Sequence, residues 1–359
     1  MKKVKLGQLV SIQTGKLDAN AAVFGGKYPF FTTAKEISRI NEYAYDGEVV
    51  LVAGNGDLNV KYYKGKFNAY QRTYILTSNS NVKMKYLYYF LDKYIEVLRY
   101  QSIGGVIKYI KLNNLSDAQI PMRSIFEQDK IIGILEKLDN EIIIRSKQLS
   151  ELSNLVKSRF SEMFGGNKQF ESIDNLFDII DGDRGKNYPK SDELFDEEYC
   201  LFLNTKNVTK NGFSFITNQF ITETKDKLLR KGKLERYDIV LTTRGTVGNV
   251  AYYDESIKYK HLRINSGMVI LRPKKPNLNQ KFIIHVLRNN NYSRMISGSA
   301  QPQLPITKLK KILLPLPPLS LQNEFADFVA QVDKSQLAIQ KSLEELETLK
   351  KSLMQEYFG

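Results

Sequence analysis

The sequence predicts an α+β protein in which two globular domains alternate with two long coiled-coil helices. The chain has 359 residues, which is too long for one typical domain. It also contains a long internal repeat, and the repeated stretches space their apolar residues as helices do. We therefore expect a first domain over 1–122, a helix over 123–165, a second domain over 166–318 and a second helix over 319–359.

The repeat organises the whole chain. Residues 120–165 and 314–359 align without a gap at a constant offset of 194, and both segments end in Phe-Gly. Matched residues include Pro121 with Pro315, Gln128 with Gln322 and, further upstream, Gly104 with Gly298. A period of this kind indicates that one unit, a globular domain plus a long helix, occurs twice. Because residue 359 corresponds to residue 165, just before the second domain, we expect the end of the chain to lie near its beginning.

Each repeated segment has the apolar spacing of a coiled-coil seam, in steps of four and three residues. The first seam has Ile131, Leu135, Leu138, Ile142, Leu149, Leu152 and Val156, and the second has Phe325, Val329, Val332, Ile339, Leu343, Leu346 and Leu353. Arg145, Arg159, Gln336 and Lys350 interrupt the seams. We predict that the final Phe-Gly ends each helix with a C-cap glycine.

The positive charge of the chain lies in the globular domains. The formal net charge is +14; residues 1–122 hold +8, residues 166–318 hold +9, and the helices hold 0 and −3. A basic helix that lies on a membrane would show the opposite distribution. Two basic domains separated by helices without excess positive charge indicate a polyanion with two contact sites, and double-stranded DNA fits this best.

The two domains share a sequence pattern in which an apolar strand leads into a glycine-rich turn, at 46–57 and at 236–253. Arg, Lys, Asn, Gln and hydroxyl side chains on such loops are the groups that contact base edges and phosphates. The first domain offers as DNA-binding candidates Lys27, Thr33, Lys35, Asn55, Asp57, Gln71 and Arg72. The second domain offers Arg184, Lys186, Asn187, Arg244, Asn249, Asn265, Gln301 and Gln303.

Motifs of catalysis and cofactor binding are missing from the sequence. The two histidines and the single Cys200 form no metal-ligand pattern, and no nucleotide-binding or S-adenosylmethionine-binding glycine motif occurs. Glu223-Thr-Lys225 has the spacing of half a nuclease site, which arises readily by chance in so charged a chain. We predict no catalytic residue, no metal and no cofactor. Since no stretch has the length of a signal peptide or a membrane span, we expect a cytoplasmic protein.

The order of domain, helix, domain and helix resembles the specificity (S) subunits of Type I restriction-modification systems, over nearly the whole chain. The helix segments 120–139 and 314–333 carry the resemblance most specifically, followed by GKYPFFTT (26–33), GDRGKNYP (182–189), TTRGTVGNVAY (242–252) and residues 298–318. The first helix departs from the family's proline-rich entry, because Met122-Arg-Ser124 stands where the second helix has Leu316-Pro-Pro318.

The resemblance implies that both globular domains are target-recognition domains and that each recognises one half of a bipartite DNA target. It also implies antiparallel helices, related by a pseudo-two-fold axis, that set the gap between the halves. Two modification (methyltransferase) subunits would supply the chemistry, and restriction subunits would supply translocation and cleavage. Two alternatives from other classes remain open, a coiled-coil interaction scaffold and a non-specific DNA-binding protein.

Overall fold

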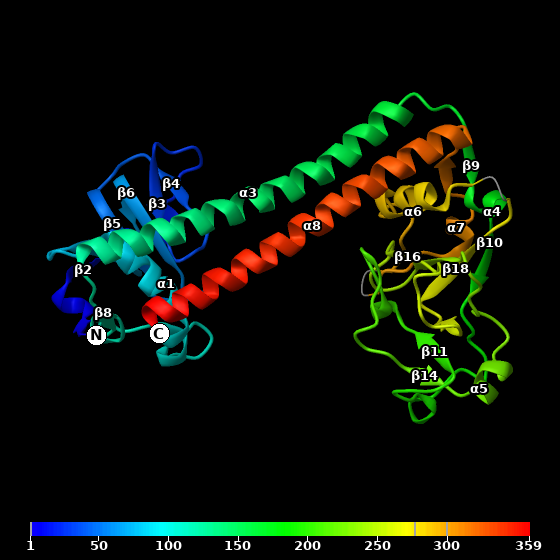
Figure 1. Ribbon diagram of the computed structural model, residues 1–359, viewed down its shortest axis with the longest axis horizontal. Helices are drawn as coiled ribbons and strands as arrows, with labels where there is room; N and C mark the ends of the chain where they lie inside the picture. The colour runs from blue at the N-terminus through cyan, green and yellow to red at the C-terminus, as the bar shows by residue number, and fades with distance from the viewer. Residues whose placement is uncertain (1, 276–277, 299–300) are drawn as a thin grey trace. The chain divides into compact units, whose positions relative to one another are not determined.

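The computed structural model describes residues 2–275, 278–298 and 301–359, and the chain forms two compact units. Unit 1 comprises residues 1–150 and 337–359, and unit 2 comprises residues 151–336. Helix and sheet occur together in both units, which confirms the predicted α+β class (Figure 1). Residues 299–300, which belong to the stretch 298–318 that carries part of the family resemblance, lie outside the described residues.

The globular part of unit 1 is built on a six-stranded sheet of order β2-β7-β5-β6-β3-β4. Helix α1 packs against β5 and β6, and a small sheet pairs β1 with β8. The elements are β1 (Lys3–Lys5), η1 (Leu6–Gln8), β2 (Val10–Thr14), η2 (Ala19–Ala21), β3 (Tyr28–Phe31), β4 (Ser38–Ile40), β5 (Tyr45–Ala53), β6 (Val60–Ala69), β7 (Thr73–Ser78), α1 (Met84–Gln101), α2 (Leu112–Ser116) and β8 (Gln119–Pro121).

The globular part of unit 2 divides its strands between a four-stranded sheet, β10-β18-β15-β16, and a three-stranded sheet, β14-β11-β17. The elements are β9 (Phe170–Ser172), α4 (Ile173–Leu176), β10 (Phe177–Asp181), η3 (Ser191–Glu193), β11 (Cys200–Leu203), η4 (Thr205–Asn207), β12 (Val208–Thr209), β13 (Gly212–Phe213), β14 (Phe220–Ile221), α5 (Glu223–Leu228), β15 (Ile239–Thr242), β16 (Val250–Tyr252), β17 (Leu262–Ile264), β18 (Met268–Pro273), α6 (Gln280–Asn289), α7 (Ile306–Leu309) and β19 (Leu313–Pro315).

The strand order repeats between the units. In unit 1 β2, β7, β5 and β6 are joined by antiparallel pairs, and in unit 2 β10, β18, β15 and β16 are joined in the same way. The antiparallel pair of β1 with β8 corresponds to that of β9 with β19, in which Pro121 and Pro315 occupy matching positions. The internal repeat therefore extends from the sequence into the topology of the sheets.

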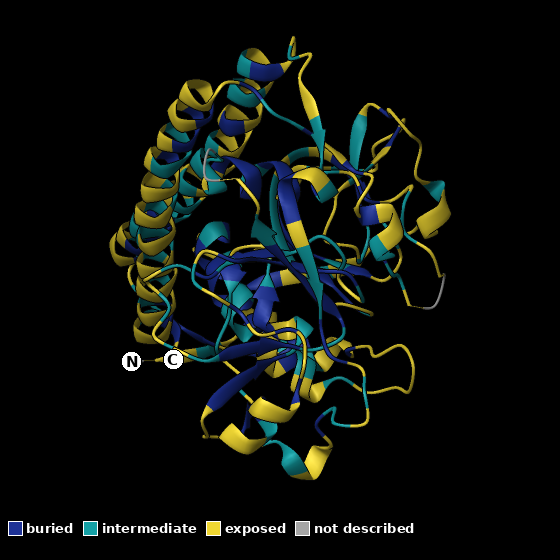
Figure 2. Ribbon diagram, turned by 90° about the vertical axis from the view of Figure 1, so that its right-hand side faces the viewer, coloured by how far each residue is buried: buried dark blue, intermediate teal, exposed yellow. Residues whose placement is uncertain are grey.

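The two repeated segments are long helices, α3 (Ile125–Phe164) and α8 (Leu319–Phe358). All the residues assigned to the two seams are buried or half-buried, while other faces of the helices are exposed (Figure 2). Three of the four polar interruptions make contacts between the helices. Lys350 pairs with Asp139 in unit 1 at 2.6 Å, and Arg159 with Glu324 in unit 2 at 2.8 Å. Gln336 donates to the Ser153 hydroxyl in unit 2.

These contacts define the direction of the helices within each unit. In unit 2, Ser153 meets Gln336, and the later residue Arg159 meets the earlier residue Glu324. In unit 1, Arg123 donates to the carbonyl of Tyr357, and Asp139 pairs with Lys350. The residue numbers rise along α3 as they fall along α8, so the helices run antiparallel in both units.

Glycine follows the last helical residue of both helices, as predicted, but the backbone of Gly165 is not that of a usual C-cap glycine. A C-cap glycine usually adopts a left-handed conformation, and Gly165 has no positive φ. Instead, a Cβ on Gly165 would lie 2.5 Å from the carbonyl oxygen of Ser161, and one on Gly359 would lie 2.3 Å from that of Gln355. Glycine is required here because the backbone turns back closely onto the last helical turn.

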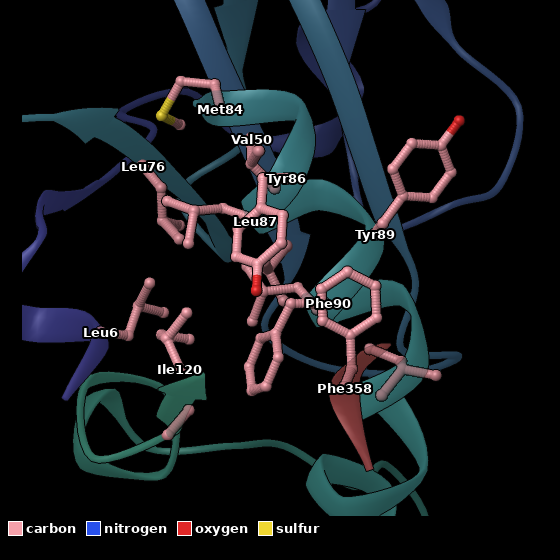
Figure 3. Packing of buried hydrophobic residues seen from close by; sticks show 14 of the residues in the cluster. Leu6, Val50, Leu76, Met84, Tyr86, Leu87, Tyr89, Phe90, Ile120 and Phe358 are labelled. Carbon is pink, nitrogen blue, oxygen red and sulfur yellow. The ribbon is translucent and has the colours of Figure 1, made fainter. Parts of the chain in front are cut away.

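The aromatic residue at the end of each helix enters the core of a globular part. Phe358 of α8 packs on Tyr86 and Phe90 of α1, with ring centroids 5.1 and 6.0 Å apart (Figure 3). In unit 2, Phe164 of α3 packs on Phe282 of α6 at 5.1 Å. The cores of both units therefore include helix residues from distant parts of the chain.

A buried glutamine connects each long helix to the shorter helix of the same unit. The side chain of Gln128, which is fully buried, accepts from the backbone N–H of Lys83 and donates to the carbonyl of Arg123. Gln322 in unit 2 accepts from the backbone N–H of Asn279 and donates to the carbonyl of Pro317. The two glutamines are matched at the offset of 194, and they satisfy the same two kinds of backbone group.

The beginning and the end of the described chain lie close together in unit 1. Lys3 and Gly359 line the same small cavity of about 380 Å³ (Figure 1). The proximity expected from the repeat is confirmed.

We predict that Gln128→Leu and Gln322→Leu each lower the free energy of unfolding by about 1–3 kcal/mol, because each removes the partner of a partly buried backbone N–H and of a partly or fully buried C=O. Urea unfolding of the full chain measures the change. Gln331→Leu on an exposed position of α8 is the matched control and should change stability by no more than about 0.5 kcal/mol. Equal effects at all three positions would contradict the structural role of the buried pair.

We also predict an acid-dependent loss of stability at His285. Burial, aided by the charge of Arg288, lowers the pKa of His285 to about 4, and its ring centroid lies 4.9 Å from that of Phe325. In the unfolded chain the imidazole of His285 takes up a proton near pH 6.5, whereas in the folded chain it stays neutral down to about pH 4. The contribution of the neutral, packed ring to stability is therefore fully present above pH 6.5 and is lost as the pH falls toward 4. Unfolding at pH 7 and pH 4.5 should show a smaller loss in His285→Phe than in the wild-type chain. An identical pH dependence would rule this out.

Candidate nucleic-acid interface

Turn 1, residues 54–57, follows strand β5 and brings candidate residues from separate segments together. The Gly54 N–H donates to the carbonyl of Arg72 at 2.8 Å, which holds Gln71 and Arg72 beside the turn. Asn55 is half-buried, whereas Gln71 and Arg72 are exposed. The backbone bonds fix the position of the loops and leave the side chain of Arg72 at the surface.

The segment after β3 reaches the same place. Asn59 donates its side-chain N–H groups to the carbonyl oxygens of Thr33 and Asp57, both at 2.8 Å. Lys35 lies 3.5 Å from the carboxylate of Asp57, which also pairs with Arg99 at 3.2 Å. Asp57 therefore neutralises part of the positive charge around it. Lys27 precedes β3, so that strand separates it from Thr33 and Lys35.

Turn 2, residues 243–248, is the counterpart in unit 2. The N–H of Thr243 donates to the carbonyl of Gly267 at 2.9 Å, as Gly54 does to Arg72 in unit 1. Asn265 shapes the neighbouring loop, because its side-chain oxygen accepts from the N–H of Gly267. Arg184 reaches the carbonyl of Ser266 in that loop and pairs with Asp181 at 3.0 Å. Turn 2 thus gathers Arg184, Arg244 and Asn265.

The loop that carries Arg184 is arranged around the buried carboxylate of Asp183. Burial by itself raises the pKa of Asp183, but the N–H groups of Gly185 and Arg230 donate to the carboxylate and hold its pKa below the usual value. A small cavity of about 280 Å³ lies here between Arg184 and Lys231. The carboxylate is engaged by backbone groups, so it supports the loop and leaves Arg184 and Lys186 exposed.

Two other candidates in unit 2 have side chains occupied by the protein. Asn249 donates to the carbonyl of Val208 at 2.9 Å, and Asn187 donates to the carbonyl of Leu228 at 3.2 Å. Both residues are half-buried. Their contact with DNA stays a prediction, and the structure gives each of them a role in holding a loop.

Two loops adjoin the turns, and most of their residues were not among the predicted DNA-binding candidates. We call residues 103–109 bridging loop 1, and we call the described residues 297–298 and 301–303 bridging loop 2. The first pairs Tyr109 with Asn55 of turn 1, and the second pairs Gln303 with Arg244 of turn 2. Only Gln301 and Gln303 were among the candidates. The matched glycines Gly104 and Gly298 were the signal that both loops belong to the repeat.

The side chains of the nuclease-like stretch form ion pairs, and the single cysteine is buried. In the Glu223-Thr-Lys225 stretch, Glu223 pairs with Lys227 and Lys225 pairs with Glu193. Burial, followed by the charge of Asp226, raises the pKa of Cys200 to about 12, which leaves an inert thiol. Over the described ranges, no cluster of three or more His, Cys, Asp or Glu is arranged to hold a metal. Within the same ranges no helix combines the length and apolarity needed to cross a bilayer.

Comparison with known proteins gives a consistent result over the whole chain. The profile of the family described as "Type I restriction modification DNA specificity domain" matches residues 1–154 and 167–349. The chain is 40% identical over 156 residues to the Type I restriction enzyme EcoDI specificity subunit of Escherichia coli, a match that covers 44% of this chain and 35% of that protein. It is 23% identical to the Type I restriction enzyme MjaVIII specificity subunit of Methanocaldococcus jannaschii, over 98% of this chain and 90% of that protein.

A solved structure shows the same fold. The crystal structure of the Type I restriction-modification system S subunit from M. genitalium superposes with a TM-score of 0.66 at 18% identity, covering 100% of this chain and 96% of that chain. At this identity the likeness supports the fold, and the family profile carries the assignment. Since that profile covers both globular parts and most of both long helices, the chain belongs to the family of DNA specificity subunits of Type I restriction-modification systems.

Proposed function

We propose that each globular domain, 1–122 and 166–318, recognises one half of a bipartite DNA target and that α3 and α8 set the gap between the halves. One observation carries this proposal. Both units hold a glycine-rich turn with the same backbone hydrogen bonds, yet the turns present different polar side chains, Asn55 in unit 1 and Arg244 in unit 2. Two domains that recognise different base sequences require a common backbone arrangement with different side chains at the DNA-contacting positions.

The charge at the turns supports an anionic partner. Within the described ranges, neither Arg72 nor Arg244 has an ion-pair partner, and the Nε of Arg244 is buried without a hydrogen bond. An arginine held beside a rigid turn without a carboxylate partner is suited to a phosphate or to a guanine edge. DNA binding would give these guanidinium groups an anionic partner.

The long helices carry exposed apolar residues at matched positions. Ile143 and Leu337 are separated by the repeat offset and are 64% and 73% exposed, and Leu155 and Leu349 have the same relation and are both 48% exposed. Exposed apolar side chains on a helix indicate a protein partner. Because the positions are duplicated, two copies of one partner fit them, and we assign these to two modification subunits.

The chain would then contribute recognition without chemistry. Glu223 and Lys225 form ion pairs with Lys227 and Glu193, and the thiol of Cys200 is buried. We propose that methyl transfer belongs to the modification subunits, and that translocation and cleavage belong to restriction subunits that join the same complex.

A selection experiment tests this function directly. The chain is assembled with its two modification subunits, and the DNA that binds is selected from a random pool and sequenced. We expect a two-part motif with a fixed gap, and replacement of residues 1–122 by another recognition domain should change one half of the motif only. Selection of no motif would support the scaffold, and salt-sensitive binding without a motif would support a non-specific DNA-binding protein.

We predict that Arg72→Ala in this complex weakens binding to all sequences without altering the motif, because the exposed guanidinium contacts a phosphate. The slope of log K against log salt concentration should fall by about 0.9. Lys334→Ala, at an exposed position on α8, removes the same charge far from the turns in sequence and is the control. An unchanged salt slope, or a changed motif, would contradict a phosphate contact.

A further inference from the structure

Bridging loop 1 is held beside turn 1 by a fixed set of backbone hydrogen bonds. Ile103 and Tyr109 exchange two bonds of 3.0 and 2.9 Å, so the loop closes on itself. The N–H of Gly56 donates to the carbonyl of Lys108, and the N–H of Ile110 donates to the carbonyl of Gly54, both at 2.9 Å. The loop therefore projects from the same place as Asn55 and Asp57.

Bridging loop 2 repeats this arrangement bond for bond. Ser297 and Gln303 exchange two bonds of 2.8 and 2.9 Å. The N–H of Gly245 donates to the carbonyl of Pro302, and the N–H of Leu304 donates to the carbonyl of Thr243, at 3.1 and 2.8 Å. Each bond in unit 2 has its counterpart in unit 1, although the side chains differ.

A glycine defines the turn in both loops. Gly104 and Gly298 have φ values of 114° and 85°, which L side chains rarely adopt. A Cβ on Gly104 would lie 2.6 Å from the carbonyl oxygen of Ile107, and one on Gly298 would lie 2.7 Å from that of Gln301. The same steric constraint acts at both positions, so the two loops are structural equivalents.

The loops present opposite chemistry on this shared backbone. In bridging loop 1, Val106 is fully exposed and Ile107 is 63% exposed. In bridging loop 2, Gln301 stands at the position of Ile107 and Gln303 at that of Tyr109, and Gln301 is exposed. Exposing two β-branched apolar side chains at a loop tip is unfavourable in water, so this feature points to a partner that covers them.

The surroundings favour DNA as that partner. Lys108 follows Ile107 directly, and Arg72 and Lys35 lie at the adjoining turn 1. In the major groove, thymine offers a 5-methyl group to apolar side chains, and adenine offers N6 and N7 to the amide of glutamine. An apolar pair and an amide pair therefore distinguish bases by different edges.

We propose that the two bridging loops are equivalent base-reading elements: Val106 and Ile107 contact thymine 5-methyl groups in the half-site of the first domain, and Gln301 and Gln303 bind an adenine edge in the half-site of the second. This inference rests on the proposed function, because it assigns the specificity of the same interface. It identifies Val106 and Ile107 as specificity-determining residues.

Base analogues in the selected target test the inference. The complex with both modification subunits is bound to duplexes in which deoxyuridine replaces thymidine in one half-site at a time, which removes only the 5-methyl group. Wild-type affinity should fall by about fourfold for each contacted methyl in the first half-site. The Val106→Gln/Ile107→Gln variant should show no such loss. A second arm replaces adenine by 7-deazaadenine, which should weaken binding only in the second half-site, and Gln301→Ala/Gln303→Ala should abolish that effect.

The following results would overturn the proposal on the bridging loops or the proposed function. Full wild-type affinity for every deoxyuridine duplex, or a first half-site without thymine, overturns the proposal while leaving the bipartite target intact. Failure of Val106→Gln/Ile107→Gln to assemble with the modification subunits also overturns it, because the loop would then be a protein-docking surface. Retention of the second half-motif by that variant shows that it is folded. Absence of any two-part motif in the wild-type complex would contradict the proposed function itself.

Discussion

Two 40-residue helices, α3 and α8, each begin in one compact unit and end in the other, and both of their ends are fixed in a core. Gln128 and Gln322 join the first turns of these helices to the backbone of the units in which they begin. Phe358 and Phe164 anchor the last turns in the aromatic cores of the units in which they end. A shift of a helix by one turn, about 5.4 Å, would break both anchors. The globular parts are therefore bound to defined points on the helices.

The turns and bridging loops of the two units can differ in their side chains without losing their position. The backbone bonds that hold turn 1 to bridging loop 1 recur between turn 2 and bridging loop 2, and none of them depends on a side chain. Substitution at Asn55, Arg244, Ile107 or Gln301 changes what the loops present without removing a bond that positions them. Duplication of one unit followed by divergence at such positions gives two recognition surfaces of different specificity on one fold.

The sequence was most informative where a pattern reflects one dominant force. Apolar spacing predicted both seams because burial of one helix face determines them, and the offset of 194 predicted the matched topology. The polar contacts of Asp57 were not predictable, because its partners Lys35 and Arg99 are far away in the chain. Val106 and Ile107 were overlooked because apolar residues in a sequence usually indicate core, and only the structure reveals their exposure. Gly165 was correctly placed at a helix end, and the structure adds that its close approach to the carbonyl of Ser161 requires glycine there.

The central proposal is that α3 and α8 together set the gap between the two half-sites of the DNA target. The most direct test is to insert seven residues into each helix, between Ser150 and Glu151 and between Gln336 and Leu337, which are the boundaries of the two units in the chain. One heptad preserves the seam and adds about 10.5 Å to each helix, which corresponds to about three base pairs at roughly 3.4 Å each. Selection with the assembled complex should return the same two half-motifs with a gap about three base pairs longer. An unchanged gap in a complex that still binds would contradict the account.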